Sequence, residues 1–195
     1  MDEMLLYLDE DGIVQTYFDR IRARRDPVVC VNVLALFHAY DRGGELPQTQ
    51  SWILNILNHR AYMDGTCYYQ TPECFLFFLS RLLPHIRSCE WRNRATVLLR
   101  ERLLERVGAP GDALALAMRI TACARVGIKD ELDLHQLLPM QLEDGSWGPG
   151  GIYKYGSSGI GIGNYGLTTA LALHAIHAIA EFSTQEEQSH DTVAH

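Results

Sequence analysis

Residues 141–148 read QLEDGSWG, and this stretch decides how the fold is interpreted. An Asp-Gly pair forms tight turns, because the Asp side chain binds nearby backbone amides and the glycine accepts a positive φ. The Gln141 side chain carries donors and acceptors that can bind the loop to its helix. An apolar helix that opens with Leu167 follows downstream. The stretch therefore predicts a compact turn, backed by the Trp147 indole, between two helices.

The chain repeats this pattern of an Asp-Gly turn, aromatic residues and a strongly apolar helix. The turns lie at Asp11-Gly12, Asp64-Gly65 and Asp144-Gly145, and the apolar helices are expected near 27–37, 72–79 and 167–182. A fourth apolar helix is expected near 112–126, and amphipathic helices near 47–60, 88–107 and 131–141. No segment alternates with period two for long enough to form a core sheet, and Gly159, Gly161 and Gly163 indicate a flexible connection. The sequence therefore predicts an all-α fold.

The segment 136–180 resembles the QW motif of squalene–hopene cyclases and class II diterpene cyclases, in which a Gln and a short spacer precede Gly-x-Trp. The likeness is sharpest to the QLxDGSWG form of plant-type diterpene cyclases. It implies the α/α toroid of the terpenoid cyclase and prenyltransferase superfamily, in which apolar helices form an inner layer and amphipathic helices an outer one. The simpler alternative is an irregular helical bundle whose Asp-Gly turns arose by chance.

The chain supplies fewer helical hairpins than a complete barrel of that superfamily contains. We therefore expect a partial α/α toroid over residues 1–183, followed by a polar disordered tail at 184–195. An open half-toroid would expose its apolar helices, which a soluble monomer rarely tolerates. This predicts a homo-oligomer, or a complex with a second chain that completes the barrel.

Composition limits the remaining possibilities. Of the 195 residues, 47% are hydrophobic and 21% are charged, which is typical of a globular domain with its own core. The formal net charge of −7 argues against a nucleic-acid partner. The five cysteines form no CxxC pair, which argues against a zinc ribbon and favours a reduced, cytoplasmic setting. We expect no signal peptide and no transmembrane segment.

In the class II cyclases that the motif resembles, an Asp of a DxDD motif at the start of an inner helix protonates an alkene or epoxide. Aromatic faces then stabilise the cation. The acid must hold its proton in a site that excludes water, and the cyclisation needs no metal or other cofactor. No DxDD is present here. The nearest segment is Asp26-Pro27-Val28-Val29, in which valines replace the later two acids.

Three carboxylates remain as candidate catalytic acids, and each has a structural alternative. Asp26 precedes a proline and is also typical of a helix N-cap. Asp64 belongs to an Asp-Gly turn and needs no catalytic role there. Glu73 lies where a negative charge favours the dipole of a helix.

A second group of residues could line a substrate cavity or simply belong to the core. Its members are Cys30, Asn32, Tyr68, Tyr69, Trp147 and Tyr165. Trp147 and Asp144 are part of the QW-like motif, whose role in the family is mainly structural. His174 and His177 have no carboxylate or cysteine beside them, so we expect no metal site. The run Arg20, Arg22, Arg24 and Arg25 fits a solvated face, with diphosphate binding as the alternative.

Together these features predict a terpene cyclase-like enzyme, an isomerase or lyase. It would catalyse proton-initiated cyclisation or isomerisation of an isoprenoid or another polyene, a hydrophobic small-molecule substrate, in an apolar cavity lined by aromatic residues. The alternative is a non-catalytic module that binds a hydrophobic ligand or completes a partner protein. The missing DxDD and the missing helices favour the module, whereas the dense aromatic loops favour the enzyme. Fold by itself does not decide between them.

Overall fold

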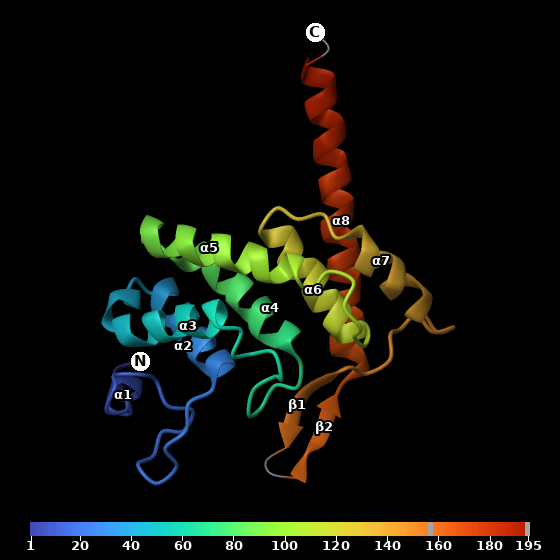
Figure 1. The fold of residues 1–195 in the computed structure, drawn as a ribbon. Coiled ribbons are helices and arrows are strands. Elements are labelled where there is room, and N and C mark those ends of the chain that lie inside the picture. Colours follow the sequence, from blue (N-terminus) through green and yellow to red (C-terminus); the bar gives the residue numbers. More distant parts are fainter. Residues whose placement is uncertain (156–157, 194–195) are drawn as a thin grey trace. The chain divides into compact units, whose positions relative to one another are not determined.

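A computed structural model describes the backbone of residues 1–155 and 158–193, and the side chains of these residues up to 182 (Figure 1). The chain divides into two compact units, Met1–Arg102 and Leu103–His195. Both units are built mainly from helices, as the sequence predicts. None of the described helices combines the length and the hydropathy that crossing a bilayer requires.

The first unit contains the elements α1 (Asp2–Leu5), α2 (Pro27–Ala39), η1 (Gly43–Glu45), α3 (Pro47–Asn58), α4 (Pro72–Leu82), η2 (Leu83–His85) and α5 (Cys89–Leu104), whose last two residues belong to the second unit. Three of the helices begin with a proline, which suits the first helical position because its missing N–H has no intrahelical partner there. The predicted helices at 27–37, 47–60, 72–79 and 88–107 are therefore confirmed within a few residues.

Helix α2 forms the centre of the first unit, where it packs against α3 and α4 (Figure 1). Its buried residues include Val31, Leu34 and Phe37. On α4, Phe75 is buried and stacks on the Tyr62 ring, with 5.0 Å between the ring centroids. Helices that are apolar on most of their surface are stable only where neighbours cover them. The apolar character of α2 and α4 thus determines their central place in the unit.

The second unit contains α6 (Ala113–Arg125), α7 (Glu131–Leu137), η3 (Leu138–Met140), β1 (Gly151–Tyr155), β2 (Ile160–Gly163) and α8 (Tyr165–Val193). Helix α6 packs against both α7 and α8. The core joins Leu116 and Ile120 of α6, Trp147 of the turn, and Ala172 and Ala175 of α8. The small alanine side chains let α8 approach α6 closely.

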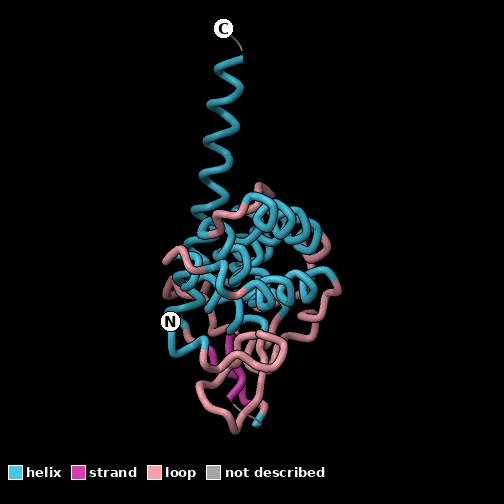
Figure 2. The backbone as a smooth tube through the Cα atoms, turned by 90° about the vertical axis from the view of Figure 1, so that its left-hand side faces the viewer, coloured by secondary structure: helices cyan, strands magenta, loops and turns pink. Residues whose placement is uncertain are grey.

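The prediction of an all-α fold is wrong in one detail, because β1 and β2 pair as an antiparallel hairpin (Figure 2). Gly161 and Gly163 lie in β2 and not in a flexible connection. The strand is only four residues long, too short for period-two patterning to be recognised. Glycine is required at 163, since an added Cβ would lie 2.5 Å from the Gly150 carbonyl oxygen.

Two further boundaries differ from those predicted. The predicted helix at 131–141 divides into α7 and a short 3-10 turn, where Pro139 interrupts the α-helical hydrogen bonding. The backbone of α8 continues to Val193. The division into a domain at 1–183 and a disordered tail at 184–195 stays a prediction.

Candidate functional site

The QW-like stretch forms the turn that its residues predict. Gly145 has a φ of +84°, and the Gln141 side chain donates from Nε2 to the Gly145 carbonyl oxygen over 2.9 Å. Asp144 accepts from the backbone N–H and the hydroxyl of Ser146, and these hydrogen bonds lower the pKa of its carboxyl. The Trp147 indole is buried and donates from Nε1 to the Leu137 carbonyl oxygen over 2.9 Å. The arrangement fastens the turn to the core of the second unit.

In the first unit, Asp26 closes the amino-terminal end of α2. Its carboxylate is fully buried, and Oδ1 accepts from the backbone N–H groups of Val28 at 2.9 Å and Val29 at 3.2 Å. Oδ2 accepts from the backbone N–H of Tyr68 at 3.4 Å. Asp26 therefore caps the helix, as the structural alternative proposed, and also fastens the Asp64-Gly65 loop to it. None of these three contacts requires a proton on the carboxyl.

A polar cluster surrounds the side chain of Tyr68, which is buried. Its Oη lies 2.5 Å from the Oη of Tyr17, and Arg24 donates from Nη1 to the same oxygen over 3.4 Å and to the Cys67 sulfur over 3.3 Å. Burial and the Tyr17 hydrogen bond raise the pKa of Tyr68 to about 12, against the opposing effect of Arg24. The Tyr68 phenol thus stays protonated at neutral pH, and one of the two hydroxyls donates to the other. The guanidinium of Arg22 covers the Tyr17 ring at 3.8 Å.

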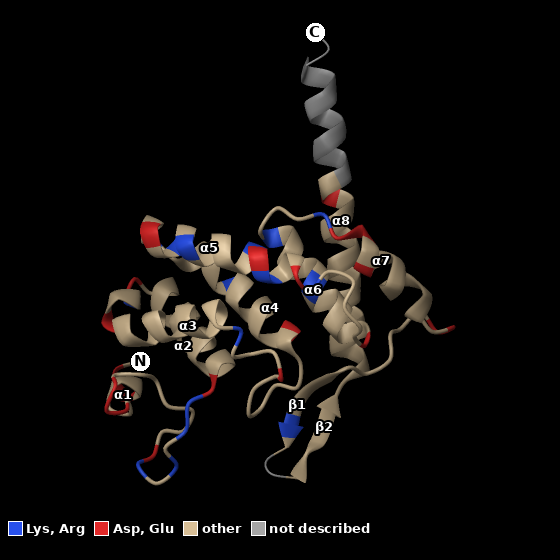
Figure 3. Cartoon of the chain, viewed as in Figure 1, with Lys and Arg blue, Asp and Glu red and all other residues tan. Residues whose placement is uncertain are grey.

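A cavity of about 810 Å³ lies beside this cluster, formed by the connection between α1 and α2. Its walls are made by Leu8, Asp9, Glu10, Gln15, Ala23, Arg24 and Arg25. The acidic residues 9–11 and a later basic run at 20–25 lie in this connection (Figure 3), and Arg25 pairs with both Asp9 and Asp11. This cavity is more polar than the apolar aromatic one that the sequence predicts.

The remaining candidates of the first unit are dispersed. Asp64 is exposed in its turn, and Asn32 is exposed in the middle of α2. Glu73 is buried in the first turn of α4. Cys30 is buried, donates to the Val14 carbonyl oxygen over 3.3 Å, and has a pKa that burial raises to about 12. Tyr69 is half-buried and packs edge-on against Phe78.

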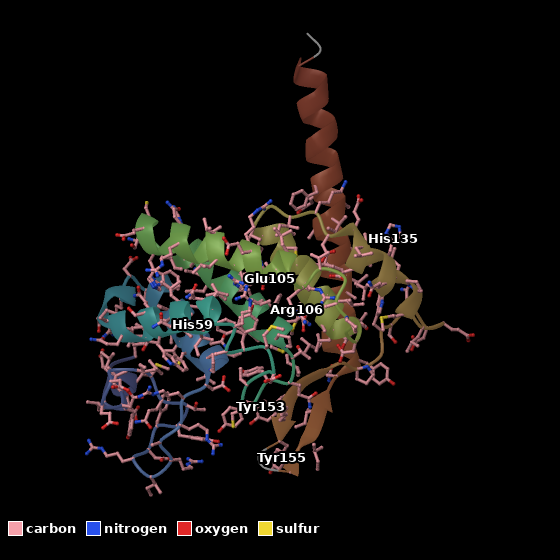
Figure 4. The ribbon with its side chains drawn as sticks, viewed as in Figure 1. His59, Glu105, Arg106, His135, Tyr153 and Tyr155 are labelled. Atoms are coloured by element: carbon pink, nitrogen blue, oxygen red, sulfur yellow. The ribbon has the colours of Figure 1, made fainter. Side chains whose placement is uncertain are left out.

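The candidates of the second unit also lie apart. Trp147 belongs to the core, whereas Tyr165 is exposed at the start of α8. The hairpin adds exposed aromatic surface that the sequence analysis did not single out, notably Tyr155 beside Tyr153 on β1 (Figure 4). Among the candidates, the Tyr68 backbone N–H donates to the Asp26 side chain, and the Cys30 N–H donates to the Asp26 carbonyl oxygen over 3.0 Å within α2.

The second unit contains a buried charge cluster that the sequence patterns do not indicate. Arg119 donates from Nε to Oδ2 of Asp133 over 2.5 Å and from Nη2 to Oδ1 over 3.0 Å. It also donates to the Ala109 carbonyl oxygen over 2.6 Å, and Asp133 accepts from the Gly108 N–H over 3.0 Å. Both charged side chains are completely buried. The pair therefore fastens the loop before α6 to α7.

Asp130 adjoins this ion pair and has unusual surroundings. Its Oδ1 caps α7 by accepting from the Asp133 N–H over 3.1 Å, whereas its buried Oδ2 has no hydrogen-bond partner among the described residues. Burial, followed by the neighbouring Asp133, raises the pKa of Asp130 from 3.8 to about 7. It is thus a buried carboxyl with a raised pKa, although no described cavity reaches it. The sequence feature that could have indicated this buried cluster is Arg119, a charged residue within the apolar sequence of α6.

Among residues 1–155 and 158–182, whose side chains the structure describes, no three or more His, Cys, Asp or Glu side chains are arranged to hold a metal ion.

Comparison with known proteins connects the chain to terpene cyclases. Residues 1–40, which include Asp26 and the first Asp-Gly turn, match the family described as sesquiterpene cyclase astC-like C-terminal domain.

The chain is also 48% identical over 176 residues to drimenol cyclase drtB of Aspergillus calidoustus. The alignment covers 90% of this chain and 33% of that protein, so the chain spans about a third of the length of this curated relative. These two similarities support a terpene cyclase-like character.

Proposed function

We propose that this chain is a terpene cyclase-like unit that takes part in the proton-initiated cyclisation or isomerisation of an isoprenoid. The observation that carries this proposal is the 48% identity to a drimenol cyclase, which extends over 90% of the chain. The finer parts of the proposal are a partial α/α toroid, a QW-like turn that stabilises it, and association with a second copy or another chain. A cytoplasmic location is part of the same proposal.

Within this function we assign Asp26 and Tyr68 to one site at the amino-terminal ends of the central helices. Asp26 accepts three backbone hydrogen bonds, so its role here is to position the loop that carries Tyr68. Glu73 and Asp64 remain the proposed proton donors, because Glu73 is buried and Asp64 lies in the same loop as Tyr68. Cys30, Asn32, Tyr69, Trp147 and Tyr165 remain proposed cavity residues.

A non-catalytic module is the second candidate. It is favoured by the capping role of Asp26 at the place where a DxDD acid would stand. Such a module would bind a hydrophobic ligand or complete a partner protein without turnover.

A product assay tests the enzyme. The purified chain, with and without a chelator, is incubated with linear polyprenyl alcohols, diphosphates and epoxides, and cyclic isomers are detected by mass spectrometry. We expect a cyclic product that the chelator does not remove, since proton-initiated cyclisation needs no metal. A folded chain that yields no product with any of these substrates contradicts the enzyme and favours the module.

Three variants then test the site assignment. Glu73→Gln or Asp64→Asn should lower turnover by at least about 100-fold, because a general acid typically contributes that much to the rate. The melting temperature should stay nearly unchanged. Asp26→Asn keeps an oxygen that can cap α2 but places its NH2 group opposite the Tyr68 N–H, so it should loosen the Tyr68 loop and lower the melting temperature together with the activity. Full turnover in both acid variants would show that the proton comes from another group.

A further inference from the structure

The β1–β2 hairpin of the second unit exposes one apolar face. In its register Tyr153 lies opposite Ile162, and Tyr155 lies opposite Ile160. Alternate residues of a strand point to the same side, so these four side chains share one face and Lys154 lies on the other. Tyr155 is 66% exposed, Ile160 62% and Ile162 43%. Large apolar side chains that are exposed together, and not singly, indicate a surface that something else covers.

The hairpin also has little packing of its own. Every residue of β2 is exposed, and β1 is half-buried up to its exposed end at Tyr155. Within the second unit the two strands project beyond the ends of α6 and α8 (Figure 1). A two-stranded hairpin is only marginally stable in water, so a surface that covers its apolar face would stabilise it. A projecting face suits contact with an extended, flat surface.

The charges along this part of the chain favour a negatively charged surface. Between Asp144 and Glu181 the sequence contains no Asp or Glu, although the whole chain has 24. Lys154 is the one Lys or Arg in the same stretch, and Figure 3 shows no acidic segment on either strand. Asp112 accepts from the Gly151 N–H over 3.1 Å at the base of the hairpin, about 13 Å along β1 from its exposed end. In a chain whose net charge is −7, the projecting end of the hairpin therefore carries a local positive charge.

We propose that the apolar face of the hairpin docks onto an anionic lipid surface. The two isoleucines would enter the boundary of the acyl chains, to a depth of about 5–10 Å. Tyrosine rings suit the headgroup level, because they are apolar along the ring and polar at the hydroxyl (Figure 4). The long Lys154 side chain can reach the lipid headgroups from the other face of the hairpin. This docking is independent of the catalytic proposal above.

Co-sedimentation of the whole chain with lipid vesicles tests the docking. Vesicles of phosphatidylcholine alone are compared with vesicles that also contain phosphatidylserine, at constant ionic strength. We expect saturable binding that is tighter to the anionic vesicles. Binding to neither kind, or equal binding to both, overturns the proposal. Sedimentation velocity without lipid examines the rival occupant: a chain that binds no vesicles but self-associates through this face would make the hairpin an interface between copies.

Matched variants make the test specific to the hairpin. Ile160→Ser should weaken binding to anionic vesicles about tenfold, and Tyr155→Ser on the other strand should weaken it as well. Ile21→Ser is the matched control, because Ile21 is 93% exposed in the first unit and should have no effect. Lys154→Gln should weaken binding to anionic vesicles about fivefold and leave binding to neutral ones unchanged. If Ile21→Ser weakens binding as much as Ile160→Ser, or if Lys154→Gln leaves the preference for anionic vesicles intact, the docking surface is wrong.

Discussion

The two units each bury an aspartate that caps a helix, but the two carboxylates have different surroundings. Asp26 of the first unit meets three backbone N–H donors, so both of its oxygens have partners. Asp130 of the second unit meets one such donor, and its Oδ2 has no partner among the described residues. A neighbouring carboxylate, Asp133, lies in the same buried cluster. Both aspartates occupy the same position at the start of a helix, so their different surroundings result from the number of N–H donors near each carboxylate.

The comparison separates two requirements that a DxDD-type acid must satisfy together. Such an acid needs a raised pKa, so that it holds its proton, and it needs contact with the substrate. Asp130 has the raised pKa but no described cavity beside it, whereas Asp26 lies near the large cavity of the first unit and is satisfied as an acceptor. Asp26 is thus engaged as a helix cap, and Asp130 lacks a described cavity beside it. Glu73 and Asp64 stay the proposed proton donors because of their positions near Tyr68 in the sequence.

The largest expected effect comes from breaking the buried ion pair beside Asp130. Arg119→Met removes the partner of Asp133 and leaves a buried carboxylate uncompensated, which should cost about 3–5 kcal/mol of the free energy of unfolding. Urea denaturation measures this loss. Lys129→Met is the control, because the Lys129–Glu131 pair is partly exposed and should contribute about 0–1 kcal/mol. Equal losses in both variants would mean that burial does not determine the strength of the Arg119 pair.

A pH titration of stability tests the surroundings of Asp130 itself. Because its pKa is raised from 3.8 to about 7, the folded chain holds a proton that the unfolded chain releases between these values. The stabilisation is therefore complete below about pH 4 and is lost as the pH rises through about 7. A shift of this size corresponds to a loss on the order of 2–4 kcal/mol. Denaturation curves at several pH values measure it.

Asp130→Asn should remove this pH dependence, since the amide cannot titrate while its oxygen can still cap α7. The variant should also be more stable than the unchanged chain at pH above about 7. Asp144→Asn is the control at an exposed turn and should leave the slope between about pH 4 and 7 unchanged, because the lowered pKa of Asp144 places its titration below that range. A slope that persists in Asp130→Asn would assign the titration to another group.

Much of the fold could be predicted, because the signals that specify it are local. The proline at the first position of α2, α3 and α4, the apolar character of α2 and α4, and the Asp-Gly turn of the QW-like stretch all act within a few residues. The hairpin was missed because its strands are short and rich in glycine, so the pairing depends on close backbone approach. Periodicity contains no information about such an approach.

The site was harder to predict, because its properties depend on contacts between distant segments. Asp130 and Asp133 look like ordinary charges at a helix start, and their surroundings depend on Arg119, 14 residues before Asp133. The Tyr17 hydroxyl meets that of Tyr68 across 51 residues. The sequence alone shows which residues can act as acids or donors, but which of them are buried together is decided by packing.

The smallest expected effect concerns the Tyr17–Tyr68 pair, in which the Tyr68 oxygen contacts both the Tyr17 hydroxyl and the Arg24 guanidinium. Tyr17→Phe removes one hydrogen bond, but Arg24 still donates to Tyr68, so the loss should be about 1 kcal/mol. The pKa of Tyr68 should fall below about 12, because Tyr17 contributes to raising it, yet stay above 10, because burial is the larger cause. Absorbance titration at alkaline pH measures it, with the exposed Tyr155→Phe as the control. A loss in Tyr17→Phe as large as that in Arg119→Met would mean that the hydroxyl pair stabilises the first unit as strongly as the buried ion pair stabilises the second.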